Sequence, residues 1–350
     1  VNQRRGFRSQ SSHEYLRRVA SRQHLTVRTG AFAQRILIED GDAVGVEYQY
    51  EGQVHRAYAR DEVLLGAGPY GTAKLLMLSG IGPKNVLSDV GVDVVRHSPG
   101  VGRNLQDHVY VIQPYRSKIH TLNKRRMSDV VKGLTDFTLH GTGILTTSVV
   151  QAMAMHRTDP ALQAPDTQIG FTPFAITREI TPEGVKVGPA KEEGFNAASM
   201  WMTPRTRGQV RLRSADPADR PLIRHDLLAD PDDLRDVMLA MKEVRRIMEQ
   251  PAMKELTYGP FPGPAGCVTA ADWERYARAN AVAPSHPVGT CRMGTDDDAV
   301  VDPELRVHGV PGLRVVDSSV MPTVTRGNTN APSMMIGERA SDFVLGHAMR

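Results

Sequence analysis

The residues best suited to do chemistry are a histidine and an asparagine in two polar loops near the end of the chain. His286 lies in Ser285–Gly294, a loop rich in proline and glycine, and Asn328 lies in Gly327–Pro332. An imidazole with an ordinary pKa of ~6.5 can accept or share a proton near neutral pH. The amide of Asn328 can donate a hydrogen bond to a developing negative charge, but it cannot act as a base.

Both residues also have a structural interpretation. A lone histidine is more often structural than catalytic. An Asn-x-Asn run ahead of a proline and a helix is good capping sequence, so Asn328 could simply cap that helix. The two interpretations of Asn328 do not exclude each other.

A glycine-rich turn earlier in the chain has the pattern of a phosphate-binding loop. Gly66–Gly71 spells G-x-G-x-x-G after an expected strand at Asp61–Leu65 and before an expected helix at Thr72–Leu78. Such glycines let the backbone approach a pyrophosphate at the helix N-terminus. The alternative is a tight turn that binds nothing. The acidic partner expected ~20 residues later is Asp89 or Asp93, and Asp89 falls in a helix-like stretch, so this turn is not expected to be the primary nucleotide loop.

The composition is that of an ordinary globular protein. The 350 residues are 40% hydrophobic and 23% charged, which suits about two domains with a substantial core. No stretch approaches the ~20 apolar residues that span a bilayer and no signal-peptide pattern opens the sequence, so a cytoplasmic location is expected. The net charge of +4 is small, which argues against nucleic-acid binding. Cys267 and Cys291 lack paired metal-ligand spacing, so no structural metal is expected.

Local patterns predict the elements that position these residues. A short helix is expected at about Tyr15–Arg22. A β-meander is expected with strands at Leu25–Val27, Ala33–Ile38 and Ala43–Tyr50, because apolar residues alternate there and Asp40–Asp42 supplies turn residues.

The second half of the chain combines helices with a further strand. Apolar residues at helical spacing predict helices at Asp232–Glu249 and Ala270–Ala279. Gly312–Asp317 has the apolar run of a buried strand, and a helix is expected from Ser333 towards Gly346. Asp107–Asp216 is less regular and is assigned to a second domain without defined strands. The predicted fold class is α/β with an α+β second domain.

Four sequence blocks together resemble one enzyme family. Gly68–Gly82 and the following Pro99–His108 are similar to the second signature of the glucose-methanol-choline (GMC) oxidoreductases, although Ala73 stands where proline is usual. Ser285–Gly294 resembles the family's His-Pro-Val-Gly-Thr-Cys block, and Val316–Pro332 resembles its closing block. The blocks occur in the family's order, which favours the functional interpretation of the histidine and the asparagine.

The resemblance implies an FAD-dependent alcohol oxidoreductase with a divided flavin domain. FAD-binding portions are expected at residues 1–106 and 283–350, and a substrate domain built on an antiparallel sheet with helices at residues 107–282. The family's dinucleotide fingerprint is not found in this sequence. The chain is therefore expected to be a C-terminal fragment, or to be completed by a second chain, and not to bind flavin tightly alone.

The resemblance also assigns site residues. It implies that His286 is the base that takes the hydroxyl proton while hydride leaves the carbon, and that Asn328 orients the substrate oxygen. The residues expected near the flavin are Gly66, Ala67, Gly68, Asp317, Ser318, Asn330 and Pro332.

The substrate is expected to be a small primary alcohol, oxidised to an aldehyde, with oxygen or another electron acceptor. Thr147–Arg157 resembles the stretch in which choline-oxidising relatives place a glutamate against the cationic head group. Gln151 stands there, and a neutral amide attracts a quaternary ammonium less, so choline is disfavoured. Gln151 and Met153 are the substrate candidates, the methionine suggesting an adaptable apolar pocket. The alternatives are a hydroxynitrile lyase-type enzyme of the same fold, and a catalytically silent fragment or binding module.

Overall fold

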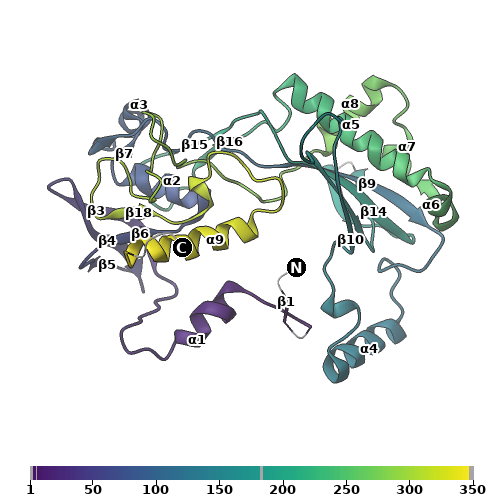
Figure 1. Ribbon diagram of the computed structural model, residues 1–350, viewed down its shortest axis with the longest axis horizontal. Coiled ribbons are helices and arrows are strands. Elements are labelled where there is room, and N and C mark those ends of the chain that lie inside the picture. The colour runs from purple at the N-terminus through teal and green to yellow at the C-terminus, as the bar shows by residue number, and fades with distance from the viewer. Residues whose placement is uncertain (1–2, 5, 182–183, 347–350) are drawn as a thin grey trace. The chain divides into compact units, whose positions relative to one another are not determined.

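The computed structural model divides the chain into two compact units, each described here by itself (Figure 1). The residues that the structure describes are 3–4, 6–181 and 184–346. Unit 1 comprises Val1–Thr26, Val109–Met202 and Asp230–Val282. Unit 2 comprises Val27–His108, Thr203–Ala229 and Ala283–Arg350.

These units differ from the sequence-based domain boundaries in two segments. Residues 1–26 group with unit 1 rather than with the flavin portion, and the Nε2 of Gln3 donates to the carbonyl of Thr146 there at 2.6 Å. Residues 203–229 group with unit 2 rather than with the substrate portion, because the amide of Val210 donates to the carbonyl of Gly102 at 2.7 Å. Both assignments follow from long-range contacts that local sequence patterns do not record.

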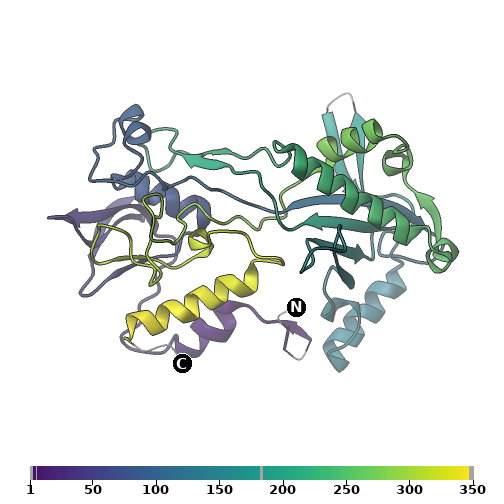
Figure 2. The ribbon, with the colours of Figure 1, turned by 45° about the horizontal axis from the view of Figure 1, so that its top comes forward.

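Unit 1 is built on an antiparallel five-stranded sheet in the order β10-β11-β14-β9-β17. Its strands are β9 (Val109–Ser117), β10 (Ala152–His156), β11 (Thr167–Thr172), β14 (Gly194–Trp201) and β17 (Thr257–Pro260). The helices that pack against it include α5 (Pro231–Met248), α7 (Pro262–Ala265) and α8 (Ala270–Asn280), as Figures 1 and 2 show. The helices predicted for this region are thus confirmed.

The smaller elements of unit 1 are short hairpins and short helices. The strands are β1 (Gln3–Arg4), β2 (Phe7–Arg8), β12 (Ile176–Thr181) and β13 (Gly184–Pro189). The helical segments are η1 (Ser12–Leu16), α1 (Arg17–Val19), α4 (Met127–Thr135), η2 (Asp136–His140), η3 (Ile144–Thr146) and α6 (Pro251–Leu256).

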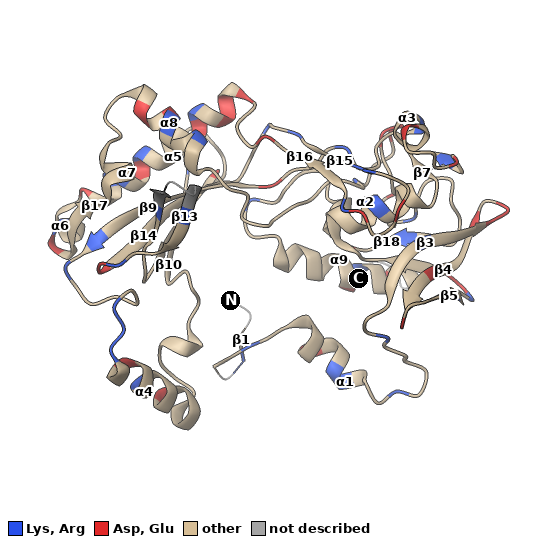
Figure 3. Cartoon of the chain, turned by 180° about the vertical axis from the view of Figure 1, so that it is seen from behind, with Lys and Arg blue, Asp and Glu red and all other residues tan. Residues whose placement is uncertain are grey.

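Helix α5 shows why the sequence folds in this way. Its apolar stripe is buried on the sheet side, and the side chain of Asp230 caps its first turn by accepting from the amide of Asp232 at 2.8 Å. On its polar side, acidic and basic residues alternate (Figure 3), as in the ion pair between Arg246 and Glu243 at 2.6 Å. The buried core of unit 1 includes Tyr115, Ile169, Ala197, Val244 and Met248.

Unit 2 contains a three-stranded antiparallel meander of β3 (Phe32–Glu39), β4 (Asp42–Tyr50) and β5 (Gln53–Tyr58). The strands predicted at Ala33–Ile38 and Ala43–Tyr50 are confirmed. The strand predicted at Leu25–Val27 is wrong, because that segment finds no partner strand among the described residues, and the third strand is instead β5.

Two strand–turn–helix segments meet in unit 2, although they are far apart in sequence. Strand β6 (Val63–Leu65) pairs in parallel with β18 (Leu313–Val315). The first strand leads into α2 (Gly68–Leu78), and the second leads through η4 (Ser318–Val320) towards α9 (Asn330–Val344), the long yellow helix in Figures 1 and 2. Helix α2 begins earlier than predicted, because Pro69 fits the first helical turn.

The remaining elements of unit 2 are short. They are β7 (Ile81–Gly82), α3 (Lys84–Asp89), β8 (Arg96–His97), β15 (Gln209–Arg211) and β16 (Leu222–Arg224). The core joins α2 to both strands of the parallel pair and to the histidine loop, with buried residues such as Leu76, Met77, Ile81, Val288 and Val315. Within the described residues of both units, no helix is long and apolar enough to cross a membrane.

Candidate active site

The structure brings the two candidate catalytic side chains together. The Nδ2 of Asn328 lies 3.1 Å from the Nε2 of His286, although the residues are far apart in the sequence. Asn328 is exposed and His286 is partly exposed. A hydroxyl placed beside this pair would meet an imidazole nitrogen and an amide, which is the arrangement needed to accept a proton and to hold an oxygen.

Asn328 does not cap the helix that follows it. Helix α9 begins at Asn330, and its N-cap is Thr329, whose side chain makes no capping hydrogen bond. The capping interpretation of Asn328 is therefore wrong, and its amide is directed to His286 instead.

The backbone of His286 is held in place by a buried carboxylate. The backbone N–H of His286 donates to both oxygens of Asp107 at 3.1 Å. Ser285 has a φ of 67°, a left-handed conformation that non-glycine residues rarely adopt. The next turn is fixed as well, because the hydroxyl of Ser318 donates to the carbonyl of Pro287 at 3.1 Å. Such strain at a site residue persists only where the surroundings hold it.

A second histidine, which the sequence analysis did not single out, lies directly behind the first. His108 is fully buried, with its Nδ1 3.0 Å from the Nδ1 of His286 and its Nε2 2.9 Å from the carbonyl of Thr325. The two rings meet edge to face, with centroids 5.1 Å apart. The signal in the sequence was its place at the end of the Pro99–His108 block.

Burial shifts the pKa values of all three titratable groups at the site. It lowers the pKa of His286 and lowers that of His108 to about 4. It raises the pKa of Asp107 to about 6, against the opposing effect of two backbone N–H donors, those of His286 and His108. Both imidazoles are therefore held towards the neutral form at neutral pH.

The carboxyl group of Asp107 should make stability depend on pH in the weakly acidic range. Because its folded pKa lies above the ordinary value of 3.8, the folded state binds the proton more tightly than the unfolded state. Stability from this group is then lost as pH rises from about 4 to about 6, by about 3 kcal/mol, and is constant above that range. Asn cannot titrate, so Asp107→Asn should not show this loss. We expect its free energy of unfolding, measured in urea and compared with that of the unsubstituted chain, to be more favourable at pH 7.5 than at pH 4 by about 3 kcal/mol. A difference between the two proteins that does not change with pH would contradict this.

The candidate flavin-side residues converge at the carboxyl ends of the parallel strands in unit 2. An oxygen of Asp317 accepts from the amide of Gly68 at 2.9 Å and from the hydroxyl of Thr72 at 2.5 Å. Gly66 and Ala67 are exposed beside them. A protein carboxylate thus occupies the first N–H of α2, which explains physically why this glycine turn is not a free phosphate loop.

Asn330 and Pro332 lie in the first turn of α9, directly after the Asn328 loop. Because no side chain caps that turn, its backbone N–H groups are left to other acceptors. Unlike the start of α2, this helix start leaves backbone N–H groups to which a polar acceptor could bind.

The two candidate substrate residues lie in unit 1. The Nε2 of Gln151 donates to the hydroxyl of Thr147 at 3.2 Å, and its backbone N–H donates to the carbonyl of Phe171. Met153 lies on β10 with 52% of its surface exposed.

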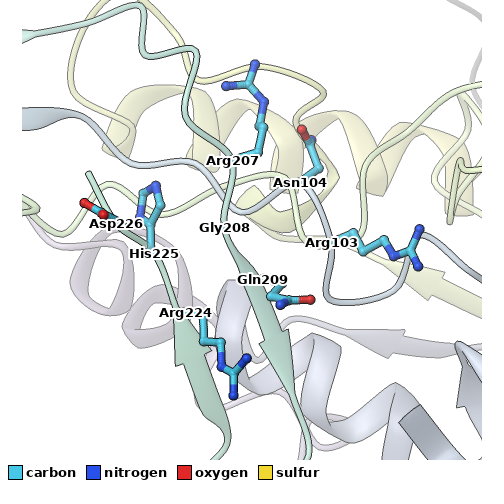
Figure 4. A pocket seen from close by; sticks show the side chains of 8 residues that line it. All are labelled: Arg103, Asn104, Arg207, Gly208, Gln209, Arg224, His225 and Asp226. Carbon is cyan, nitrogen blue, oxygen red and sulfur yellow. The ribbon is translucent and has the colours of Figure 1, made fainter. Parts of the chain in front are cut away.

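A polar pocket of about 720 Å³ in unit 2 is lined by basic side chains (Figure 4). The guanidinium groups of Arg103, Arg207 and Arg224 point in different directions. That of Arg207 donates to carbonyl oxygens of its own loop, such as that of Pro204 at 2.7 Å. The pocket therefore lacks convergent donors for one anion. Among the described residues no cluster of His, Cys, Asp and Glu could hold a metal ion.

Comparisons with known proteins agree with this architecture. Two family models, each described as GMC oxidoreductase, match residues 1–110 and 204–337. The oxygen-dependent choline dehydrogenase of Vibrio vulnificus is 38% identical over 97% of this chain and 60% of its own length. A GMC-type oxidoreductase of Mycobacterium bovis is 39% identical over 98% of this chain and 64% of its own length.

Solved structures share the fold. Pyridoxine 4-oxidase from Mesorbium loti, at 27% identity, has a TM-score of 0.86 over 100% of this chain and 64% of its own. Formate oxidase from Aspergillus oryzae, at 24% identity, has a TM-score of 0.89 over 98% of this chain and 64% of its own. This chain thus spans between 60% and 64% of the length of these curated relatives and solved structures. Because the two family models together match more than half of its residues, the chain belongs to the GMC oxidoreductase family.

Proposed function

We propose that this chain carries the catalytic residues of an FAD-dependent enzyme that oxidises a primary alcohol to an aldehyde, with His286 as the base. The observation that carries the proposal is the contact of 3.1 Å between the Nε2 of His286 and the amide of Asn328. Family membership supports the reaction class, and choline and pyridoxine, named for two similar proteins, both carry a primary alcohol.

The residues of unit 2 fit a flavin. The backbone at Gly66 and Ala67 is exposed at the carboxyl end of the parallel strands, where ligands of such sheets bind. Gly68 has a φ of 74°, and apart from its chain neighbours and the backbone of its own helix no protein atom lies within 4 Å of the place that a Cβ would take, so backbone approach is open there. The N–H groups in the first turn of α9, at Asn330 and Ala331, are suited to a carbonyl-bearing ring. We assign Asp317 and Ser318 to the same side of the site.

Each side chain then has a distinct task. The Nε2 of His286 takes the proton of the substrate hydroxyl, and the amide of Asn328 donates to the oxygen as negative charge develops on it. Bound FAD supplies the acceptor for the hydride that leaves the alcohol carbon. Asp107 holds the backbone of His286, so that the ring is positioned before the substrate arrives.

The experiment is a spectroscopic titration, without oxygen, of the complete protein loaded with FAD, because the sequence predicts that this chain binds flavin only weakly by itself. We expect at least one primary alcohol to bleach the visible flavin absorbance, with one aldehyde formed for each flavin reduced. Readmission of oxygen, or addition of another acceptor, then distinguishes an oxidase from a dehydrogenase.

The alternatives give different results in the same titration. A hydroxynitrile lyase would cleave a cyanohydrin without bleaching the flavin, and in a binding module no alcohol would bleach it. Choline serves as a second probe. By the resemblance, Gln151 stands where choline-oxidising relatives carry a glutamate, so a neutral alcohol of similar size should react better than choline.

A further inference from the structure

The hydrogen bonds around His108 determine which of its ring nitrogens carries a hydrogen. Its Nε2 lies 2.9 Å from the backbone carbonyl of Thr325, and a carbonyl oxygen can only accept. The hydrogen of a neutral His108 is therefore on Nε2, and its Nδ1 has a free lone pair. The ring is fully buried, and no carboxylate of the described residues bonds to it, which favours the neutral form.

This arrangement decides the protonation of His286 in turn. The Nδ1 atoms of the two rings are 3.0 Å apart, so one hydrogen must lie between them. His108 cannot supply it, because its own hydrogen is bonded to Thr325. The hydrogen is therefore on the Nδ1 of His286, and the Nε2 of His286 presents its lone pair to the amide of Asn328 at 3.1 Å.

We propose that His108 is a positioning residue that holds His286 in the Nδ1–H tautomer and so keeps its Nε2 free to accept a proton. The opposite tautomer would bring two lone pairs within 3.0 Å of each other inside a buried contact. The amide of Asn328 could turn over to suit either tautomer, but the contact between the two rings could not. The catalytic consequence rests on the proposed function, whereas the tautomer of His286 does not.

The tautomer can be measured on this chain without flavin. In protein labelled with ¹⁵N-histidine, nitrogen chemical shifts distinguish a protonated from a bare ring nitrogen, and the spectrum of His286→Asn identifies the signals of His286. We expect a protonated Nδ1 and a bare Nε2 for His286 at a pH where it is neutral. His97 is an internal reference, because its Nδ1 accepts from the amide of Lys84 at 3.2 Å and its hydrogen should be on Nε2.

Two variants of His108 separate its two hydrogen bonds. In His108→Asn the amide oxygen takes the position of Nδ1 and can still accept from His286. In His108→Gln the terminal amide takes the position of Nε2, so the bond to Thr325 can remain while the acceptor for His286 is lost. We expect His108→Asn to retain the Nδ1–H tautomer of His286 and His108→Gln to convert most of it to the Nε2–H form.

The kinetic counterpart uses the FAD-loaded protein. We expect His108→Gln to slow flavin reduction by roughly 10²-fold. A histidine held in the wrong tautomer in a serine protease triad costs ~10⁴-fold, which is a larger effect. In His108→Asn, flavin reduction should be nearly as fast as in the unsubstituted protein. The affinity for FAD and for the alcohol should change little in both variants. A merely structural role would instead lower rate and binding together, with no difference between the two amides.

The outcomes are distinguishable. An Nε2–H tautomer of His286 in the unsubstituted chain would overturn the proposal, and this result requires no variant to fold. An unchanged tautomer in a folded His108→Gln would overturn it as well, and so would unchanged flavin reduction in that variant where an alcohol reduces the flavin of the unsubstituted protein. The expected tautomers, combined with a flavin that no alcohol reduces, would refute the proposed function while the assignment of His108 stands.

Discussion

Replacing His286 by alanine should slow reduction of the flavin by roughly 10²–10⁴-fold, because the variant lacks the group that takes the hydroxyl proton in the transition state. Stopped-flow measurement of flavin bleaching in the FAD-loaded protein isolates this step from reoxidation. The dissociation constant of the alcohol should change much less, since the base acts on a proton that moves only during the reaction. Equal losses in binding and in rate would argue against this role.

Asn328→Ala is the matched comparison. It removes one hydrogen bond to a developing charge, worth ~1.5–3 kcal/mol, which corresponds to roughly a 10- to 10²-fold loss in rate. The base would remain, so the expected order is a smaller loss for Asn328→Ala than for His286→Ala. If Asn328→Ala were more damaging while both variants held FAD, His286 would not be the base. If neither variant affected flavin reduction, the reaction would take place elsewhere.

The sequence predicted best the features that are local or belong to long blocks of resemblance. Helix α5 was predictable because its apolar residues recur at helical spacing along its whole length, between polar residues. His286 and Asn328 could be proposed as site residues because each lies in a sequence block that resembles one of the family, and the blocks occur in the family's order. Their contact is a property of the fold, since it depends on how two loops of unit 2 approach each other.

Features that depend on distant pairings were not predictable in the same way. The central strands β9 and β14 lack regular alternation, because buried polar residues such as Gln113 and Asn196 interrupt it. Asp317 was expected near the flavin, but the bond from the amide of Gly68 to its carboxylate joins two distant segments and could not be predicted from its neighbours in the chain. His108 was missed for the same reason, since its role comes from the ring it touches and not from its own neighbours in the chain.

The parallel strands that support the candidate site are joined by a largely buried ion pair. The Nε and Nη2 of Arg314 on β18 donate to the two oxygens of Glu62, which directly precedes β6, at 2.6 and 3.0 Å. The side chain of Arg314 is only 7% exposed and that of Glu62 is 28% exposed. The Nη1 of Arg314 is held by the carbonyl of Glu304 at 2.5 Å, so the guanidinium cannot simply turn to water.

Glu62→Ala should therefore lower the free energy of unfolding of unit 2 by about 2–3 kcal/mol, because it leaves a buried guanidinium without its counter-charge. The lower end reflects the bond to Glu304 that remains. Hydrogen exchange of the Val316 amide, which donates to the carbonyl of Leu65, measures the pairing of β18 with β6 directly. Tryptophan fluorescence is unsuitable, since Trp201 and Trp273 both lie in unit 1.

Two further variants test the cause of that loss. Glu274→Ala removes an exposed ion pair with Arg278 and should cost no more than about 0.5 kcal/mol, with no change in exchange at Val316. Combining Glu62→Ala with Arg314→Met removes the buried guanidinium as well as its carboxylate partner. The double variant should therefore be more stable than Glu62→Ala alone. If Glu62→Ala lowered the free energy of unfolding no more than Glu274→Ala does, the ion pair would not hold the two strands together. The rigidity of the parallel pair would then come from the apolar core around α2 alone.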